Sequence, residues 1–248
     1  MTKKILITGA SSGIGRALAY ELADRGYALA LTARRLETLE DIRNDVKVKH
    51  PDATVVVQPL DVVAYDSVPE VISTCVAELG GLDILFANAG IGLGEKVGKG
   101  DFGKARQTIE TNLLGAIATV DAAVQYFLEQ GRGHIVGVSS VAAYRGLPRS
   151  SAYSASKAGF AIYLESVRAE VIRKDIDVTV LYPGYIDTPL NDMLPSRPFL
   201  ITVEKGARMI ADMIEQKVKA STVPVWPWCI LGRLLKLLPT SVVAKLSG

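Results

Sequence analysis

The strongest constraint on the fold is the alternation of short apolar runs with longer amphipathic stretches. Leucine and β-branched residues dominate the runs, which lack the polar alternation of a half-exposed strand. Strands that are covered on both faces of a sheet have this composition. We therefore predict strands at 4–8, 28–32, 54–58, 82–87, 134–139 and 177–182, and a weaker one at 222–225, where Pro224 favours an edge.

Helical periodicity fills the segments between the runs. Apolar residues recur at helical spacing over 14–25, 36–49, 66–79, about 102–130 and about 151–174. The order strand, helix, strand, helix predicts an α/β protein with the Rossmann fold: a doubly wound parallel sheet of about seven strands with helices on both faces. With 248 residues, 49% of them apolar, the chain suffices for one such domain over 1–248.

Composition narrows the classes of function. A net charge of +2 offers no reason to expect nucleic acid as a partner. The two cysteines, Cys75 and Cys229, lack metal-ligand spacing, so we expect no metal site and no disulfide framework. The N-terminal apolar run is too short for a signal peptide, and no segment has the roughly 20 apolar residues of a membrane span. These features favour a cytoplasmic protein.

Glycines cluster between the first strand and the first helix, in the segment TGASSGIG from Thr8 to Gly15. Gly9 permits a tight turn, Gly13 lets backbone approach a pyrophosphate, and Gly15 lets the helix pack on the sheet. Free N–H groups at the start of the helix suit phosphate oxygens. The spacing is G-x-x-x-G-x-G rather than the simplest dinucleotide fingerprint, and a turn without a ligand is the alternative interpretation.

The end of the second strand indicates which dinucleotide the turn would bind. An acidic residue about 20 residues beyond such a turn marks NAD, because it binds the ribose 2′-hydroxyl. Arg34 and Arg35 stand at that place here, and an arginine fork suits a 2′-phosphate. The sequence predicts NADP(H), with Arg34 as the first choice and Ser12 as a hydroxyl partner. Solvated arginines at a helix start are the alternative.

A tyrosine and a lysine lie four residues apart in the segment SSAYSASKAGF. Tyr153 and Lys157 share one face of the predicted helix, and a neighbouring ammonium favours phenolate, so Lys157 should lower the pKa of Tyr153. Ser140 ends the preceding strand, 13 residues before Tyr153. Because ligands bind beyond the carboxyl ends of parallel strands, this context favours a proton-transfer site over an idle Tyr–Lys pair.

Further motifs at strand ends make the chain similar to a known family. It resembles the short-chain dehydrogenases/reductases, in their roughly 250-residue, NADP(H)-preferring subgroup. Ala87 is a small departure, since many members have asparagine there. The motifs run in order from residue 3 to about 190: TGASSGIG, LDV (60–62), ANAG (87–90), TNLLG (111–115), VSS (138–140), YSASK (153–157) and YPGYIDT (182–188).

The resemblance implies a role for each matching residue. Tyr153 would be the general acid/base, and Lys157 would bind the nicotinamide ribose and perturb the tyrosine. Ser140 would hydrogen-bond the substrate oxygen, and Asn112 would hold a water in a proton relay. A turn-closing Ser140 and a helix-kinking Asn112 are the alternatives. The implied cofactor-binding residues are Gly9, Ser11, Ser12, Gly13, Ile14, Gly15, Arg34, Arg35, Asp61, Val62, Asn88, Ala89, Gly90, Tyr153, Lys157, Pro183, Gly184, Ile186 and Thr188.

Residues 188–202 hold three prolines and predict a long substrate loop. No cluster of arginines demands an acidic substrate, although Arg145, Arg149 and Arg197 could reach a carboxylate or phosphate. The pocket should be mainly apolar, formed by Leu93, Leu147, Tyr185, Leu190, Met193, Leu194, Phe199 and Leu200.

The C-terminal tail at about 226–248 combines an apolar stripe with charges that are all basic: Arg233, Lys236 and Lys245. Packing against another subunit or over the substrate pocket is one interpretation. Peripheral contact with the inner face of a membrane is the other, because basic amphipathic helices bind such surfaces.

Three functions compete at this point. The first is an NADPH-dependent oxidoreductase that interconverts a carbonyl and an alcohol by hydride transfer, on an apolar or lipid-like substrate, as a homodimer or homotetramer. The second is a non-enzymatic NADP(H)-binding regulator, which would have no need of a polarised phenol. The third is a sugar-nucleotide epimerase or dehydratase, for whose substrate domain the chain has no room.

Overall fold

Seven parallel strands form one sheet in the order β3-β2-β1-β4-β5-β6-β7. The computed structural model describes residues 2–192, 194 and 196–245. Every predicted strand is present with its ends displaced by at most two residues, and β7 lies at an edge. The Rossmann fold is confirmed. The strands are β1 (Lys4–Thr8), β2 (Ala28–Ala33), β3 (Val55–Pro59), β4 (Ile84–Ala87), β5 (Arg132–Val138), β6 (Asp175–Pro183) and β7 (Ala220–Val223).

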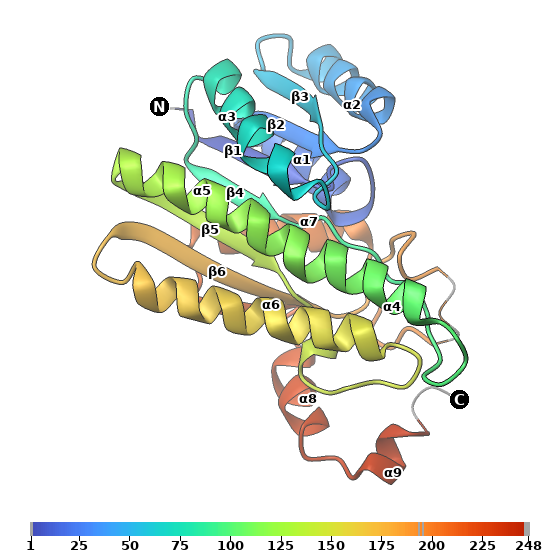
Figure 1. Cartoon of the computed structure of the whole chain (residues 1–248). Coiled ribbons are helices and arrows are strands. Elements are labelled where there is room, and N and C mark those ends of the chain that lie inside the picture. The colour runs from blue at the N-terminus through green and yellow to red at the C-terminus, as the bar shows by residue number, and fades with distance from the viewer. Residues whose placement is uncertain (1, 193, 195, 246–248) are drawn as a thin grey trace.

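Helices cover both faces of the sheet, so that the core consists of two apolar layers (Figure 1). One layer lies between the sheet and α3 (Val68–Leu79), α5 (Ala116–Gln130) and α6 (Ser151–Glu170). The other lies between the sheet and α1 (Gly13–Asp24), α2 (Leu36–Lys49) and α7 (Val203–Glu215). Burial on both sides explains why the strands lack a polar face.

Two glycines in β5 bring the helices close to the sheet. A Cβ on Gly133 would lie 2.2 Å from Cγ of Phe127 on α5, and a Cβ on Gly137 would lie 2.2 Å from Cδ1 of Leu164 on α6. Neither side chain has room to move in a close-packed core. The absence of side chains on β5 therefore sets the depth of α6, the helix that carries Tyr153 and Lys157.

The structure corrects three helix predictions. The helix expected over about 102–130 is interrupted: α4 (Phe102–Ile109) runs into a π-helical segment, η2 (Glu110–Gly115), before α5 begins. Such single π turns occur often at functional sites. A 3₁₀ turn, η1 (Tyr65–Ser67), precedes α3, and α6 ends at Glu170 rather than near residue 174. The sequence interpretation missed α7 altogether, although its buried residues recur at helical spacing.

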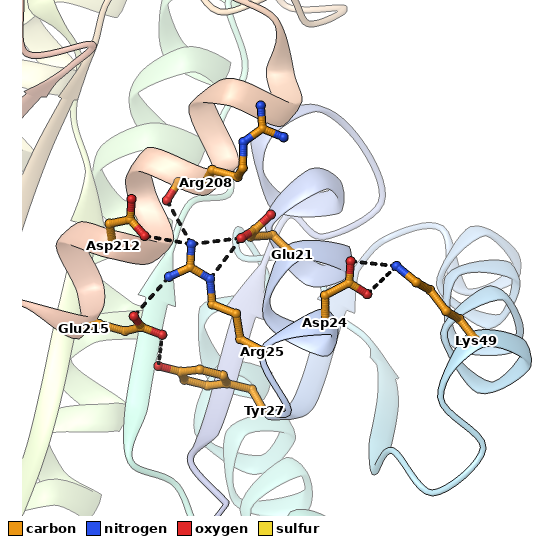
Figure 2. A network of polar contacts seen from close by, with 8 residues as sticks. All are labelled: Glu21, Asp24, Arg25, Tyr27, Lys49, Arg208, Asp212 and Glu215. Carbon is orange, nitrogen blue, oxygen red and sulfur yellow. Dashed lines mark hydrogen bonds and ion pairs between the residues drawn. The ribbon is translucent and has the colours of Figure 1, made fainter.

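A charged network fastens α7 to α1 (Figure 2). Arg25, directly after α1, pairs with Glu21 (2.9 Å), Asp212 (2.7 Å) and Glu215 (3.0 Å). Burial alone would lower the pKa of Arg25, but hydrogen bonds with Asp212 and Glu21 raise it above its ordinary value. Glu215 also accepts a hydrogen bond from Tyr27 (3.5 Å). The network therefore fixes α7 against α1 on one face of the sheet.

The C-terminal segment forms two short helices, α8 (Trp228–Leu235) and α9 (Thr240–Val243). Trp228 and Val243 are buried, whereas the other face exposes large apolar side chains: Trp226 (71%), Ile230 (50%), Leu234 (47%), Leu237 (78%) and Val242 (41%). One face therefore packs within the chain, where Trp228 lies against Tyr185 and Phe199, and the other face is open. The contact with another subunit and the contact with a membrane both stay predictions. No helix within the described residues combines the length and apolarity needed to cross a bilayer.

Candidate active site

The carboxyl ends of the strands surround one cleft of about 680 Å³. Nearly all of the predicted catalytic and cofactor-binding residues line it, from the glycine turn after β1 to Thr188 after β6. The two exceptions, Gly15 and Asn112, lie just behind its wall, as described below. The topology thus brings together residues that are up to about 180 positions apart, as expected for an open parallel sheet.

The glycine turn is shaped for close contact with a ligand. Gly9 and Gly13 adopt positive φ angles of 67° and 53°, which favour glycine. A Cβ on Gly15 would lie 2.5 Å from the carbonyl oxygen of Gly9, so Gly15 packs the helix against the turn itself. The first turn of α1 carries no acidic residue, and Ser12 makes no capping bond. Its N–H groups are therefore available for phosphate oxygens, and the turn fits the pyrophosphate of a dinucleotide.

Thr8, which the sequence interpretation did not single out, couples this turn to the end of β4. Its hydroxyl accepts hydrogen bonds from the N–H groups of Asn88 and Ala89, both 3.1 Å long. The amide of Asn88 in turn donates to the carbonyl oxygens of Thr8 (3.0 Å) and Gly9 (3.4 Å). Two walls of the cleft are thereby held in one fixed arrangement.

The end of β2 places both arginines at the rim of the cleft. Both arginines are exposed. Arg35 donates to the hydroxyl of Ser11 (3.0 Å) and to its carbonyl oxygen (3.4 Å), whereas within the described residues Arg34 makes no hydrogen bond to the turn. Arg35, rather than Arg34, is therefore the arginine in contact with the glycine turn. Asp61 lines the next section and caps its own turn by accepting from the N–H of Val63 (3.1 Å).

Tyr153 stands half-buried in the first turns of α6 and faces the cleft. Burial raises the pKa of its phenol, a hydrogen bond with Ser140 lowers it, and the neighbouring Tyr185 raises it further. The net direction is upward, so the prediction that Lys157 lowers this pKa is wrong for the structure. The physical reason is that desolvation disfavours phenolate more than the hydrogen bond with Ser140 favours it.

Lys157 lies one turn further along α6 and is buried. Its ammonium donates to the carbonyl oxygen of Val138 (2.9 Å) and lies 5.9 Å from the ring centroid of Tyr153. Burial lowers the pKa of Lys157 to about 8. Ser139 holds the same turn, because its hydroxyl donates to the carbonyl oxygen of Lys157 (2.8 Å). The ammonium is thus anchored at the end of β5.

Asn112 lies fully buried in η2, behind the cleft wall. Its side-chain oxygen accepts from the N–H of Ile91, and its amide donates to the carbonyl of Ile91, both at 2.8 Å. The amide also donates to Ser156 (3.3 Å) on α6. Gly90 leaves room for these contacts, since a Cβ there would lie 3.2 Å from Asn112 Oδ1. Asn112 therefore holds Ile91 with both ends of its amide and joins that segment to α6 through the NH2 end.

The substrate loop closes one side of the cleft. A bridge between Ile186 and Ile201 fastens its base, and Leu190 and Leu194 line the cleft, as do Leu93, Leu147 and Tyr185. Phe199 instead packs edge-on against Trp228 (5.9 Å), and the predicted pocket residue Met193 lies outside the described residues.

The three arginines that could bind an acidic substrate differ in their contacts. Arg197 pairs with Asp187 (2.7 Å) and Asp192 (3.6 Å), and Arg145 donates to the carbonyl of Leu238 (3.2 Å). Arg149 alone of the three lines the cleft. The substrate end of the cleft is therefore mainly apolar.

A comparison with protein-family profiles shows which family the chain belongs to. The profile described as "short chain dehydrogenase" matches residues 3–198. The chain belongs to the short-chain dehydrogenase/reductase family. An uncharacterized oxidoreductase of Mycobacterium tuberculosis is 39% identical to this short-chain dehydrogenase over 98% of the chain and 96% of that protein. The 11-beta-hydroxysteroid dehydrogenase 1A of Arabidopsis thaliana is 40% identical over 76% of the chain and 54% of its own length.

Solved structures agree with this assignment. An alcohol dehydrogenase from Thermococcus sibiricus complexed with 5-hydroxy-NADP superposes with a TM-score of 0.80 at 28% identity, over 90% of this chain and 95% of that one. The actinorhodin polyketide ketoreductase with NADPH gives 0.80 at 25% identity, with the same shares covered. The protein is an oxidoreductase of this family with a nucleotide-binding Rossmann fold, and a nicotinamide cofactor fits its cleft.

Proposed function

We propose that this short-chain dehydrogenase is an NADPH-dependent oxidoreductase that reduces a carbonyl to an alcohol, or catalyses the reverse reaction, with Tyr153 as general acid/base. The observation that carries the proposal is the convergence of Tyr153, Ser140 and Lys157 on the cleft that the glycine turn opens. A regulator that only binds nucleotide would have no use for a buried ammonium beside a phenol, because burying that charge is unfavourable.

The residues divide the chemistry between them. When bound, the nicotinamide supplies or accepts the hydride. Ser140, at the end of β5, would hydrogen-bond the substrate oxygen and hold it at the phenol. A raised pKa keeps Tyr153 protonated at neutral pH, which suits a proton donor to a carbonyl oxygen during reduction. Lys157 would bind the nicotinamide ribose, and Asn112 would keep the segment after β4 in place for it.

Replacement of Tyr153 tests the assignment. We expect Tyr153→Phe to reduce turnover by at least about 10³-fold, because the proton donor is lost, while the Kd for NADPH stays within about twofold. The rate of NADPH oxidation by the wild type and the variant would be measured with ketones, aldehydes, 3-ketoacyl thioesters, ketosteroids and long-chain keto-lipids. Near-normal turnover of the variant would reject the mechanism, and an inactive wild type that binds NADPH tightly would favour the regulator.

The preference for NADP(H) rests on Arg34, Arg35 and the hydroxyls of the glycine turn. The end of β2 offers Thr32 and Ala33 where an acid would bind the ribose of NAD, and Arg35 already contacts Ser11. We expect Arg35→Ala to lower kcat/KM for NADPH by about 10–100-fold, the loss of a charge-assisted bidentate contact. Arg34→Ala is the matched variant, and NADH should be used about equally well by all three proteins. A wild-type preference for NADH would contradict the assignment.

The substrate that fits this site is an apolar or lipid-like carbonyl compound. Five apolar side chains of the predicted pocket line the cleft, and two of the three candidate cationic side chains are engaged elsewhere. The Arabidopsis relative is named for its action on a hydroxysteroid, which is a compound of this kind. Activity confined to small charged carbonyl compounds would contradict this choice.

The exposed face of the tail is proposed to meet an anionic membrane surface. It combines Trp226, Ile230 and Leu237 with the exposed cation Arg233. Lys236 is also exposed and holds its ammonium 5.6 Å from the ring centroid of Tyr144, and the chain contains no acidic residue after Glu215. In a twofold interface the same patch faces itself, so these cations would repel their own copies, whereas anionic lipid neutralises them. The expected homodimer or homotetramer would then use another face. We expect flotation with vesicles containing phosphatidylserine but not with neutral vesicles, and loss of flotation in Trp226→Ser/Leu237→Ser. If the wild-type protein floats with neither type of vesicle, the proposal is contradicted.

A further inference from the structure

We propose that Glu95 is a positioning residue for Tyr153: its carboxylate caps α6 from the loop after β4 and fixes where the phenol stands in the cleft. This proposal rests on the proposed function, in which Tyr153 transfers the proton. No motif in the sequence marks Glu95, which lies in a glycine-rich stretch between β4 and α4.

Glu95 is anchored to the start of α6 by three hydrogen bonds. Its Oε1 accepts from the hydroxyl of Ser151 (2.7 Å) and from the N–H of Ala152 (2.6 Å), the residue before Tyr153. Its own N–H donates to the carbonyl of Arg149 (3.2 Å). The side chain and the backbone of one residue therefore hold the first turn of α6 and the segment that leads into it.

Glu95 caps α6 in place of the residue at the N-cap position. Ser150 occupies the N-cap position, where serine commonly accepts a bond from the helix, yet it makes no such bond. A carboxylate 55 residues away in sequence takes its place and also meets the positive end of the helix dipole. The Glu95 cap therefore couples the position of α6 to that of the loop after β4. A bond from Ser150 would join the helix only to its own N-cap residue.

The burial of Glu95 is unusual. It is 4% exposed, and among the residues that the structure describes, Glu95 and Lys157 are the only buried side chains of the Asp, Glu, Lys and Arg types. Its Oε2 has no hydrogen-bond partner in the described part of the chain. A buried carboxylate with one free oxygen is unfavourable for stability. Glu95 thus contacts the first turn of α6 just before Tyr153, and Lys157 lies in the second turn just after it.

The location of the loop gives the cap its functional consequence. Leu93 and Gly94 line the cleft on one side of Glu95, and Leu147 to Ser150 line it next to the start of α6. Glu95 joins these two lining segments, so loosening it should displace the phenol and the apolar wall together. A displacement of about 1 Å at a reacting group can lower turnover by about 100-fold.

Four variants in the full-length protein separate positioning from simple stability. Glu95→Ala removes the cap, and Glu95→Asp shortens it by one methylene while keeping the charge. Glu95→Gln keeps the accepting oxygen and removes the charge. Asp101→Ala is the matched control, because Asp101 is an acid at the start of α4 in the same loop, where it accepts from the N–H of Lys96 (3.1 Å).

We expect kcat to fall by about 10–100-fold in Glu95→Ala and Glu95→Asp, and to stay within about threefold in Glu95→Gln and Asp101→Ala. The Kd for NADPH should stay within about twofold in all four, because the hydrogen bonds of Glu95 go to Arg149, Ser151 and Ala152 and not to the glycine turn. If Glu95→Ala fails to fold, the contrast between Glu95→Asp and Glu95→Gln decides. Wild-type kcat in Glu95→Asp, or equal losses in Glu95→Asp and Glu95→Gln, would overturn the proposal.

A measurement without substrate keeps this test independent of the proposed function. The ionisation of Tyr153 can be followed by ultraviolet difference titration of each protein against its Tyr153→Phe counterpart. We expect the titration midpoint to move by about half a pH unit or more in Glu95→Asp, because the burial of the phenol and its bond to Ser140 both depend on the first turn. An unchanged midpoint would overturn the proposal even if the wild type reduces no carbonyl compound.

Discussion

Two cations in this molecule are removed from water in opposite ways. Arg25 lies between α1 and α7 with three carboxylates around it, and its pKa is raised. Lys157 lies beneath the cleft with the carbonyl oxygen of Val138 as its hydrogen-bond acceptor, and burial lowers its pKa to about 8. The carboxylates around Arg25 neutralise its charge. Among the described residues, the ammonium of Lys157 has only a neutral carbonyl as acceptor and can still bind a ligand in the cleft.

The difference teaches where to look for function in a fold of this kind. A charge that is compensated locally contributes to stability, because its partners favour the ionised form. A buried charge without an ionic partner destabilises the fold, and such groups persist mainly where chemistry needs them. By this criterion we infer that the Arg25 network is structural, and we propose a functional role for Lys157 and for Glu95, which contacts the start of α6.

Among the variants of the two cations, the largest effect should come from removing the buried ammonium of Lys157. We expect Lys157→Met to lower kcat by at least about 10²-fold, and to raise the free energy of unfolding by about 1–2 kcal/mol, because an apolar side chain replaces an unpaired buried charge. Steady-state kinetics and urea denaturation at pH 7 would measure the two quantities. A variant that is both inactive and clearly less stable than the wild type would break the comparison, since it would make Lys157 a structural residue too.

The pH dependence of stability sharpens the same contrast. In the unfolded chain Lys157 has its ordinary pKa of 10.5, and in the folded protein about 8. Between these values the unfolded state holds the proton that the folded state has lost, so stability rises with pH across this window. The deficit of the wild type relative to Lys157→Met should be complete below pH 8, roughly 3 kcal/mol at most, and vanish towards pH 10.5. Urea denaturation at several pH values would measure it, and a deficit that grows with pH would contradict the assignment.

Removing Arg25, the cation with carboxylate partners, should lower stability and leave turnover unchanged. Arg25→Met leaves Glu21, Asp212 and Glu215 without their common partner, so the free energy of unfolding should fall by about 2 kcal/mol. Turnover and NADPH binding should stay within about twofold at temperatures where the variant is folded. Urea denaturation and steady-state kinetics test this. Loss of turnover without loss of stability would show that the network acts on the cleft.

The smallest effect is expected at the neighbouring exposed pair in Figure 2. Lys49 binds Asp24 with two contacts of 2.7 Å, and this hydrogen bond, with a second from His50, lowers the pKa of Asp24. The Lys49 side chain is 65% exposed, so Lys49→Met should change the unfolding free energy by less than about 1 kcal/mol. A loss as large as that of Arg25→Met would mean that exposure does not separate the two cations.

Patterns that are local in sequence predicted most of the fold. The strands were placed within two residues because burial on both faces leaves a run without polar positions, and a short run has few alternative boundaries. Helix α7 was missed although its periodicity is strong, and the π-helical segment around Asn112 was missed because it depends on contacts with Ile91 and Ser156. The π-helical segment is defined by what it packs against, whereas α7 could have been predicted from its periodicity.

The sequence by itself determined the sheet, the glycine turn and the identity of the residues at the strand ends, because each follows from composition and from spacings of a few residues. Only the tertiary structure decided the pKa direction of Tyr153, the engagement of Arg35 rather than Arg34 with the glycine turn, and the contact of Glu95 with Ala152. Burial and hydrogen bonding between distant segments set these properties. They depend on distances that no spacing along the chain encodes.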